Sequence, residues 1–141
     1  MHLQLITLTG IVVDKGIYEM IAPTTSGDIA VFPGHEPLVT LAAPGALAVR
    51  NAKGDSDAQL EYFAISGGVI EIDQTSIRVL VDEADNGEDI IEAETKNALE
   101  RALKHRENAK SQVEIHKATQ LVNRQQIKLR VADLQRRHRN R

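Results

Sequence analysis

The distribution of glycine and proline divides this chain into two parts that must fold differently. All nine glycines and all four prolines lie at or before Gly87, and residues 88–141 contain neither. Glycine and proline punctuate strands and turns, but both weaken the interior of a helix. The sequence therefore predicts a β-rich domain over residues 1–84 and a helical domain over residues 85–141.

The first part contains short apolar or alternating runs separated by turn signals such as Pro33-Gly34 and Pro44-Gly45. Gly67 and Gly68 are expected to supply positive φ at a tight reversal, and residues 73–76 to close the next hairpin. Seven or more short strands indicate a sandwich or a barrel. Because the chain has only four aromatic residues, its core is expected to consist of Ile, Val, Leu and Ala. The runs are LQLITL, GIYEMIA, DIAVF, ALAVR, LEYFAI, GVIEI and SIRVLV.

The second part has the periodicity of two amphipathic helices joined near residues 107–112. Asp85 or Asn86 is expected to cap the first helix, with acidic side chains in its first turn. Alanine-rich stripes bury little area at ~25 cal/mol per Å², so we expect a hairpin that is only modestly held. The fold class is therefore α+β, a sandwich followed by an antiparallel helical hairpin. The stripes comprise Ile91, Ala98, Ala102 and Ala109, and then Ile115, Ala118, Val122, Ile127, Val131 and Leu134.

Composition excludes several classes of protein. The chain has no cysteine, which rules out disulfides and thiolate metal sites and suits a reducing compartment. No segment approaches the ~18 apolar residues of a membrane span, and the N-terminus lacks the basic region of a secretion signal. Charge is divided: residues 1–82 carry 4 basic and 10 acidic side chains, whereas residues 122–141 carry 7 basic and one acidic.

The pair His35-Glu36 is the most conspicuous candidate for chemistry. A zinc-protease helix needs a second histidine at position 39, which is Val39 here, and Pro37 interrupts the helix. The sequence offers no nucleophile and orienting carboxylate to accompany a catalytic histidine. We therefore interpret the pair as part of a rigid turn, and predict neither catalytic nor metal-binding residues.

Other site motifs fail on spacing. The chain lacks the Gly-Lys dipeptide of a phosphate-binding loop, and SGGVIE lacks the spacing and the following helix of a dinucleotide fingerprint. Asp55-Ser56-Asp57 resembles the start of a calcium loop, but Leu60 and Ser66 occupy the positions that require Gly and Glu.

The basic C-terminus has three possible roles. It can be a solvated helix end, favoured by the helix dipole, or a contact for an acidic protein partner. Nucleic-acid binding is disfavoured because the net charge is negative and stacking aromatics are missing.

Several segments in order resemble the epsilon subunit of the bacterial F-type ATP synthase. They are GDIAVFPGHEPLVTLAAPGALAVR, EYFAISGGVIEI with IRVLVDEAD, and GEDIIEA opening a helix pair that ends in IKLRVADL. The resemblance covers almost the whole chain. It implies a ten-stranded sandwich and a two-helix hairpin in a non-catalytic subunit of the central stalk, on the cytoplasmic face of the bacterial inner membrane.

The resemblance also implies partners and contact residues. The sandwich would bind the gamma subunit and rest on the membrane rotor ring, with Asp28, Pro33, Gly34 and His35 facing the ring. The hairpin would extend into the alpha/beta catalytic head and inhibit ATP hydrolysis of a proton-translocating enzyme. Its contacts would be Arg124, Lys128, Arg130, Arg136, Arg137 and Arg139.

One departure from the family pattern concerns ATP. Some relatives bind ATP through an Ile/Leu-Asp-x-x-Arg-Ala motif at the first helix, where Glu92 occupies the arginine position in this chain. A carboxylate would repel the triphosphate, so no cofactor is expected. Without the resemblance, the alternative is an adaptor module whose helix pair binds a partner coiled coil.

Overall fold

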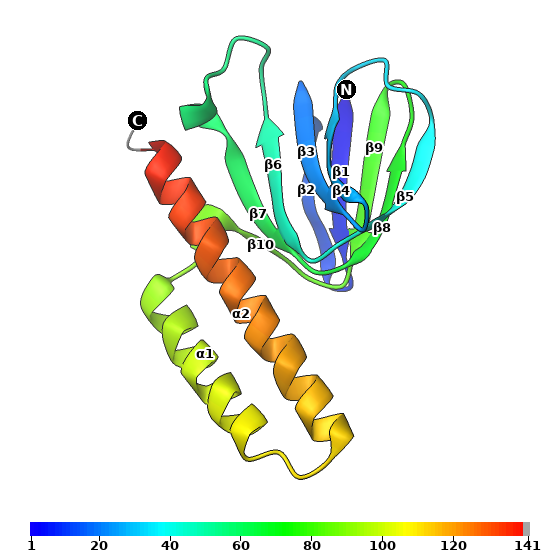
Figure 1. Ribbon diagram of the computed structural model, residues 1–141. Coiled ribbons are helices and arrows are strands. Elements are labelled where there is room, and N and C mark those ends of the chain that lie inside the picture. Colours follow the sequence, from blue (N-terminus) through cyan, green and yellow to red (C-terminus); the bar gives the residue numbers. More distant parts are fainter. Residues whose placement is uncertain (140–141) are drawn as a thin grey trace.

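The computed structural model, which describes residues 1–139, consists of a ten-stranded β-sandwich and a C-terminal pair of helices (Figure 1). This confirms the predicted fold class. The strands are β1 His2–Thr7, β2 Gly10–Gly16, β3 Glu19–Thr24, β4 Gly27–Val31, β5 Leu38–Ala42, β6 Gly45–Arg50, β7 Glu61–Ile65, β8 Gly68–Ile72, β9 Ser76–Val81 and β10 Ala84–Asn86.

The strands follow the order β10-β7-β6-β3-β5-β8-β9-β1-β2, with β4 paired to β3. One pairing, Thr24 with Ala42, joins β3 to β5, so the chain of strands bends there into two layers (Figure 1). Neighbours are antiparallel except β1 and β9, which run parallel. A short helix, η1 (Asp57–Gln59), interrupts the connection between β6 and β7.

The core between the layers is largely aliphatic, as the composition predicted, with Phe63 and Met20 as its largest other members. Leu3, Leu5, Leu47, Ile70 and Ile77 are completely buried in it. Every member of this core comes from the first 81 residues. The sandwich therefore has a core of its own, the inner core.

The expectation of positive φ at Gly67 and Gly68 is wrong. Among the described residues only Gly10, Gly27 and Gly34 have positive φ. Gly68 instead lies in β8 opposite Val81, and a Cβ built on it would come within 2.0 Å of the Leu80 carbonyl oxygen. Close strand approach, not turn geometry, requires glycine there.

The strand prediction was incomplete at three elements. Strands β2, β5 and β10 have no counterpart among the seven predicted runs. The last of these, with sequence ADN, is polar, and it forms because its backbone extends the edge of β7. Backbone pairing of this kind leaves no hydrophobic signal.

The helices are α1 Glu92–Glu107 and α2 Gln112–Arg139, so the predicted break near residues 107–112 is confirmed. The predicted cap of the first helix is wrong. The Asn86 side chain accepts a hydrogen bond from the Glu88 amide and caps the short helix η2 (Gly87–Asp89). The α-helix begins later, because the chain first completes β10 and η2 against β7.

The second core lies where α2 crosses the outer face of β6 and β7 (Figure 1). Val131 is completely buried against Ala48, Leu60, Tyr62 and Ala64. The buried residues of α1 are Thr95 and Ala102, and α2 buries Ala118 and Val122. Ile91, at the start of the predicted stripe, is 57% exposed, so that stripe is buried only in part. Neither helix is long and apolar enough to cross a membrane.

Candidate interaction surfaces

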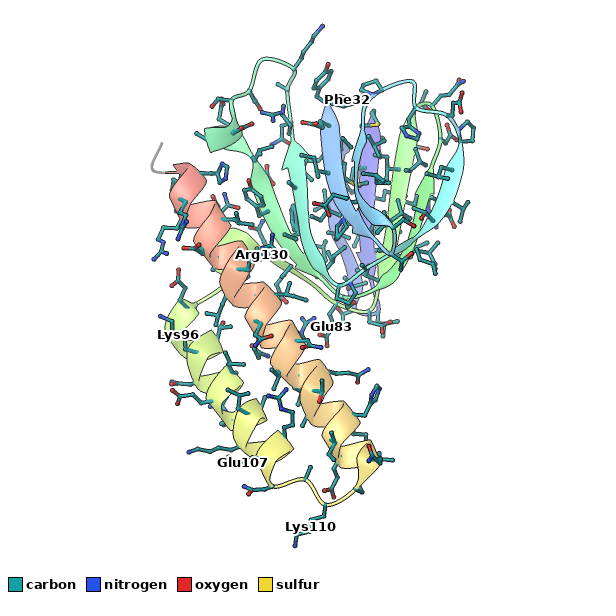
Figure 2. The ribbon with its side chains drawn as sticks, in the orientation of Figure 1. Phe32, Glu83, Lys96, Glu107, Lys110 and Arg130 are labelled. Carbon is teal, nitrogen blue, oxygen red and sulfur yellow. The ribbon has the colours of Figure 1, made fainter. Side chains whose placement is uncertain are left out.

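The predicted ring-contact turn lies at the end of the sandwich far from the hairpin tip, as the positions of Phe32 and Lys110 show in Figure 2. Gly34 adopts φ +86°, and its amide donates to the Gln74 carbonyl at 2.9 Å, which ties the turn to the β8–β9 connection. The His35 amide donates to Phe32 O at 3.2 Å, and its Nδ1 lies 2.6 Å from Glu36 O. Pro33, Gly34 and His35 thus form a braced, surface-facing turn.

Asp28 is not part of that turn. It is exposed near the start of β4, whereas Pro33 follows the end of the strand. Five residues of extended chain separate them by about 16 Å. A partner that contacts both must therefore lie along β4. His35 belongs to no metal-binding group, since no three His, Asp or Glu side chains gather suitably within residues 1–139.

An apolar band crosses the outer face of the β5-β8-β9-β1-β2 layer. Directly paired residues of neighbouring strands project from the same face of a sheet. Leu41 and Ile11, at the two ends of the band, are 58% and 57% exposed. The band consists of one residue from each strand, which pair in the order Leu41, Val69, Leu80, Ile6 and Ile11.

The next row on the same face is mostly polar. Glu71 and Arg78 form an ion pair at 3.5 Å, and Gln4 pairs in register with Arg78. This contrast makes the apolar band a distinct surface. Sequence reasoning missed it, although runs such as Leu3 to Leu8 and Val79 to Val81 place apolar residues on both faces of their strands. Apolar residues at both odd and even positions of a strand are the sequence signal that could have revealed the band.

The predicted inhibitory cations lie on α2, and four of the six form ion pairs with other residues in the described range 1–139. Arg124 contacts Glu83 at 2.5 Å and Asp85 at 2.7 Å. Arg139 contacts Glu88 at 2.6 Å. These carboxylates come from the β9–β10 connection, β10 and η2, so the ion pairs link the last helix to the segment that leaves the sandwich.

The other two paired arginines share Asp133 of their own helix. Arg136 lies 2.5 Å from that carboxylate and 3.6 Å from Glu92, while Arg137 lies 3.0 Å from Asp133. The hydrogen bond from Arg136, with Arg137 nearby, lowers the pKa of Asp133. Arg130 is exposed and Lys128 is half-buried. Asn140 and Arg141, the end of the basic terminus, lie outside the described residues.

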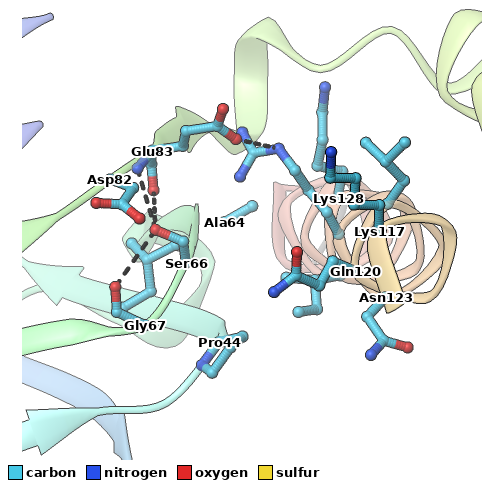
Figure 3. Close-up of a pocket in the computed structure, with 14 residues that line it drawn as sticks. Pro44, Ala64, Ser66, Gly67, Asp82, Glu83, Lys117, Gln120, Asn123 and Lys128 are labelled. Atoms are coloured by element: carbon cyan, nitrogen blue, oxygen red, sulfur yellow. Dashed lines mark hydrogen bonds and ion pairs between the residues drawn. The ribbon is translucent and has the colours of Figure 1, made fainter. Parts of the chain in front are cut away.

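Two pockets flank α2. The larger, of about 650 Å³, is a wedge between the helix and the edge of the sandwich (Figure 3). Pro44, Ser66 and Gly67 line one side, and Gln120 and Lys128 the other. Glu83 and Arg124 bridge the wedge through their ion pair.

The smaller pocket, of about 290 Å³, lies at the start of α1. Its lining includes the carboxylates Asp85, Asp89 and Glu94, beside Arg101 and Lys128. Glu92, at the arginine position of the ATP motif, is paired with Arg136. Three carboxylates around a pocket do not fit a triphosphate, so the absence of ATP binding stays our prediction.

Comparison with known proteins places this geometry in one family. A family model described as the β-sandwich domain of the ATP synthase delta/epsilon chain matches residues 1–87. The ATP synthase epsilon chain of Chromobacterium violaceum is 41% identical over 102 residues, covering 70% of this chain and 71% of that relative.

Solved structures share the fold. A chain of the Euglena gracilis mitochondrial ATP synthase, in a structure of OSCP, F1 and c-ring, superposes with a TM-score of 0.67 at 23% identity, covering 96% of this chain and 78% of that one. A chain of the Tetrahymena thermophila mitochondrial ATP synthase, in a structure of central stalk and c-ring, gives 0.59 at 12%, covering 93% and 95%. On the sequence matches, this chain belongs to the ATP synthase epsilon-chain family, whose members are non-catalytic subunits.

Proposed function

We propose that this chain is a central-stalk subunit that couples the gamma subunit to the membrane rotor ring and inhibits ATP hydrolysis through its C-terminal helices. The solved relatives in the ciliate and euglenid enzymes come from structures that contain the c-ring. Since the sequence relative is bacterial, the chain would sit peripherally, at the cytoplasmic face of the bacterial inner membrane.

The two sandwich surfaces support the coupling role. Burial of the apolar band by a partner would lower the free energy of the complex, which suits permanent attachment to gamma. The turn at residues 33–35 is braced by a proline and by the Gly34 hydrogen bond, which suits transmission of force to the ring. Separate surfaces allow the sandwich to hold both partners at once.

Coupling is testable by purification of the assembled enzyme. His35→Ala, or Asp28→Lys, is expected to reduce co-purification of the chain with the rotor ring while its binding to gamma persists. Both side chains face away from the inner core, so folding should be retained. Ring association equal to that of the wild type in both variants would contradict the proposed contact.

One observation carries the regulatory role: the cations that would contact the head are largely occupied by the chain's own carboxylates. In the docked hairpin Arg124, Arg136 and Arg139 each meet acidic groups outside α2. Contact with an acidic surface of the head would replace these partners. For Arg124 and Arg139, whose partners lie outside the two helices, docking and inhibition are then mutually exclusive states of the same side chains, separated by a few kcal/mol.

Deletion of residues 122–141 should raise ATP hydrolysis by the assembled head. A sharper variant is Lys128→Gln with Arg130→Gln, which removes two cations that form no ion pair in the described part of the chain. It should relieve inhibition without loosening the docked hairpin. Unchanged hydrolysis in the deletion variant would remove the inhibitory role for this protein.

A further inference from the structure

Gln135 is the most deeply buried polar side chain of α2. It is 6% exposed, although it lies immediately before the basic run of residues 136–139. Its Oε1 accepts from the Tyr62 amide at 3.0 Å, and its Nε2 donates to the Leu60 carbonyl at 3.1 Å. Both partners are backbone groups of the sandwich, so one side-chain amide is bound at two points.

The two backbone groups bound by Gln135 lie next to the point where the pairing of β7 with β10 ends. On that edge, β7 pairs with β10 as far as Phe63 opposite Asn86. Beyond this point β10 gives way to η2, and the Gln135 amide takes the place of the missing strand at Leu60 and Tyr62. A carboxamide carries the same donor and acceptor as a peptide group, so it can continue a β-ladder.

The surrounding packing is shaped for this contact. A Cβ on Gly87 would lie 3.2 Å from Gln135 Cβ and 3.1 Å from Val131 Cγ1, so glycine lets α2 approach closely. Val131, one turn before Gln135, is completely buried in the second core. The amide therefore sits beside an apolar contact, where an unpaired backbone group is most unfavourable.

We propose that Gln135 is the positioning residue that holds the helical hairpin on the sandwich, by pairing with the backbone at the start of β7. The ion pairs of α2 are exposed in part and weak individually. The apolar contact is not directional. The two hydrogen bonds of Gln135 are buried and directional, so they fix the helix in one register. This inference rests on the proposed regulatory function only in linking hairpin release to inhibition.

The test measures hairpin opening in the full-length chain. Because the chain has no cysteine, two spin labels can be attached through cysteines introduced at Lys53 and Arg137. Those positions flank the contact between the end of α2 and the β6–β7 connection, where His138 Nδ1 meets Asp57 O. Electron–electron double resonance then gives the populations of short and long distances between the two labels.

Gln135→Met keeps the side-chain length and removes both hydrogen bonds. We expect its opening equilibrium to increase about tenfold or more, as for a lost buried hydrogen bond. Gln126→Met, on the exposed side of the same helix, is the matched control and should stay at the wild-type value. Equal opening in the Gln135 variant and the wild type would overturn the proposal.

Gln135→Glu separates hydrogen bonding from packing. Its protonated form can accept from Tyr62 and donate to Leu60, whereas its carboxylate would face the Leu60 carbonyl without a donor. Docking should therefore be near normal at pH 4 and reduced at pH 8, with no such change beyond the wild type's in Gln126→Glu. Opening of Gln135→Glu that does not depend on pH would assign the effect to packing and contradict our inference.

Hydrolysis by the assembled head distinguishes this inference from the proposed function. If Gln135→Met opens the hairpin and lowers ATP hydrolysis, both are supported. If it opens the hairpin and hydrolysis is unchanged, the role of Gln135 stands and the inhibitory function fails.

Discussion

At the scale of single residues, Gly68 shows how one atom constrains the sandwich. A methyl group there would meet the Leu80 carbonyl oxygen at 2.0 Å and the Leu80 carbonyl carbon at 3.0 Å. These are backbone atoms of β9, which can move only by breaking the pairing of Val69 and Leu80. We expect Gly68→Ala to lower the free energy of unfolding by about 3 kcal/mol or more.

Urea denaturation at neutral pH measures this effect. Gly54→Ala is the control, because a Cβ at that position meets nothing within 4 Å and the φ angle is not positive. It should unfold within about 0.5 kcal/mol of the wild type. Similar stability of the two variants would mean that β8 and β9 do not pair as closely as described.

The Glu61 carboxyl is expected to make the stability of the protein depend on pH. Burial alone would raise the pKa of its carboxyl, but hydrogen bonds from Lys15 at 2.8 Å and Asn51 at 2.6 Å outweigh it and lower the pKa below the ordinary 4.5. The stability that follows from a lowered pKa is present above the pKa of the unfolded chain. It is lost as the pH falls through the lower pKa of the folded state.

Glu61→Gln should therefore flatten the acid limb of the stability profile. The wild type is expected to lose more free energy of unfolding than the variant as the pH falls below about 4.5. Denaturation in buffers between pH 7 and pH 3 provides the profile. A wild-type limb no steeper than that of the variant would show that the carboxylate gains nothing from these partners.

At the scale of elements, the attachment of α2 to the segment leaving the sandwich depends on Arg124. Its side chain is 24% exposed and bridges Glu83 and Asp85. Arg124→Gln should destabilise docking by about 1 kcal/mol, a value typical of a partly exposed pair. Added salt should open the wild-type hairpin more than it opens the variant, because the bridge is screened.

Hydrogen exchange of the α2 amides measures that opening. Arg130→Gln is the control, because Arg130 is exposed on the same helix. Exchange should be faster in the Arg124 variant at low salt and nearly equal in the three proteins at high salt. A difference that persists undiminished at high salt would assign the effect to packing of the arginine stem.

The elements also differ in how far the sequence predicted them. The helices were recognisable because side-chain periodicity and the absence of glycine and proline act locally. The start of α1 was not, since residues 84–89 pair with β7 and pack against α2 before the helix begins. Likewise, β10 depends on a partner strand and has no apolar pattern of its own.

The candidate surfaces also differ in whether local sequence or contacts between distant segments determine them. The turn around His35 could be predicted because proline and glycine fix the backbone locally. The apolar band could not, because it takes one residue from each of five strands and exists only in their register. The role of Gln135 depends on two backbone groups more than seventy residues away in sequence, so no local pattern indicates it.

At the scale of the whole molecule, the two cores have different compositions. The inner core contains no residue of either helix. The second core combines Ala48, Leu60, Tyr62 and Ala64 of the sandwich with Val131 of α2. A hairpin that leaves the sandwich during regulation must therefore leave an intact inner core and an exposed apolar face behind it.

We therefore predict that a chain ending at residue 90 folds as a sandwich. It should unfold cooperatively in urea, with a free energy lower by about 2–5 kcal/mol, the contribution of a few buried aliphatic side chains. It should also bind an apolar dye that the full chain excludes, because the face beneath α2 becomes exposed. If the shortened chain shows no cooperative transition, the sandwich needs the hairpin to stay folded. Release of the hairpin would then unfold the part that carries force, and a regulatory mechanism based on that release could not operate.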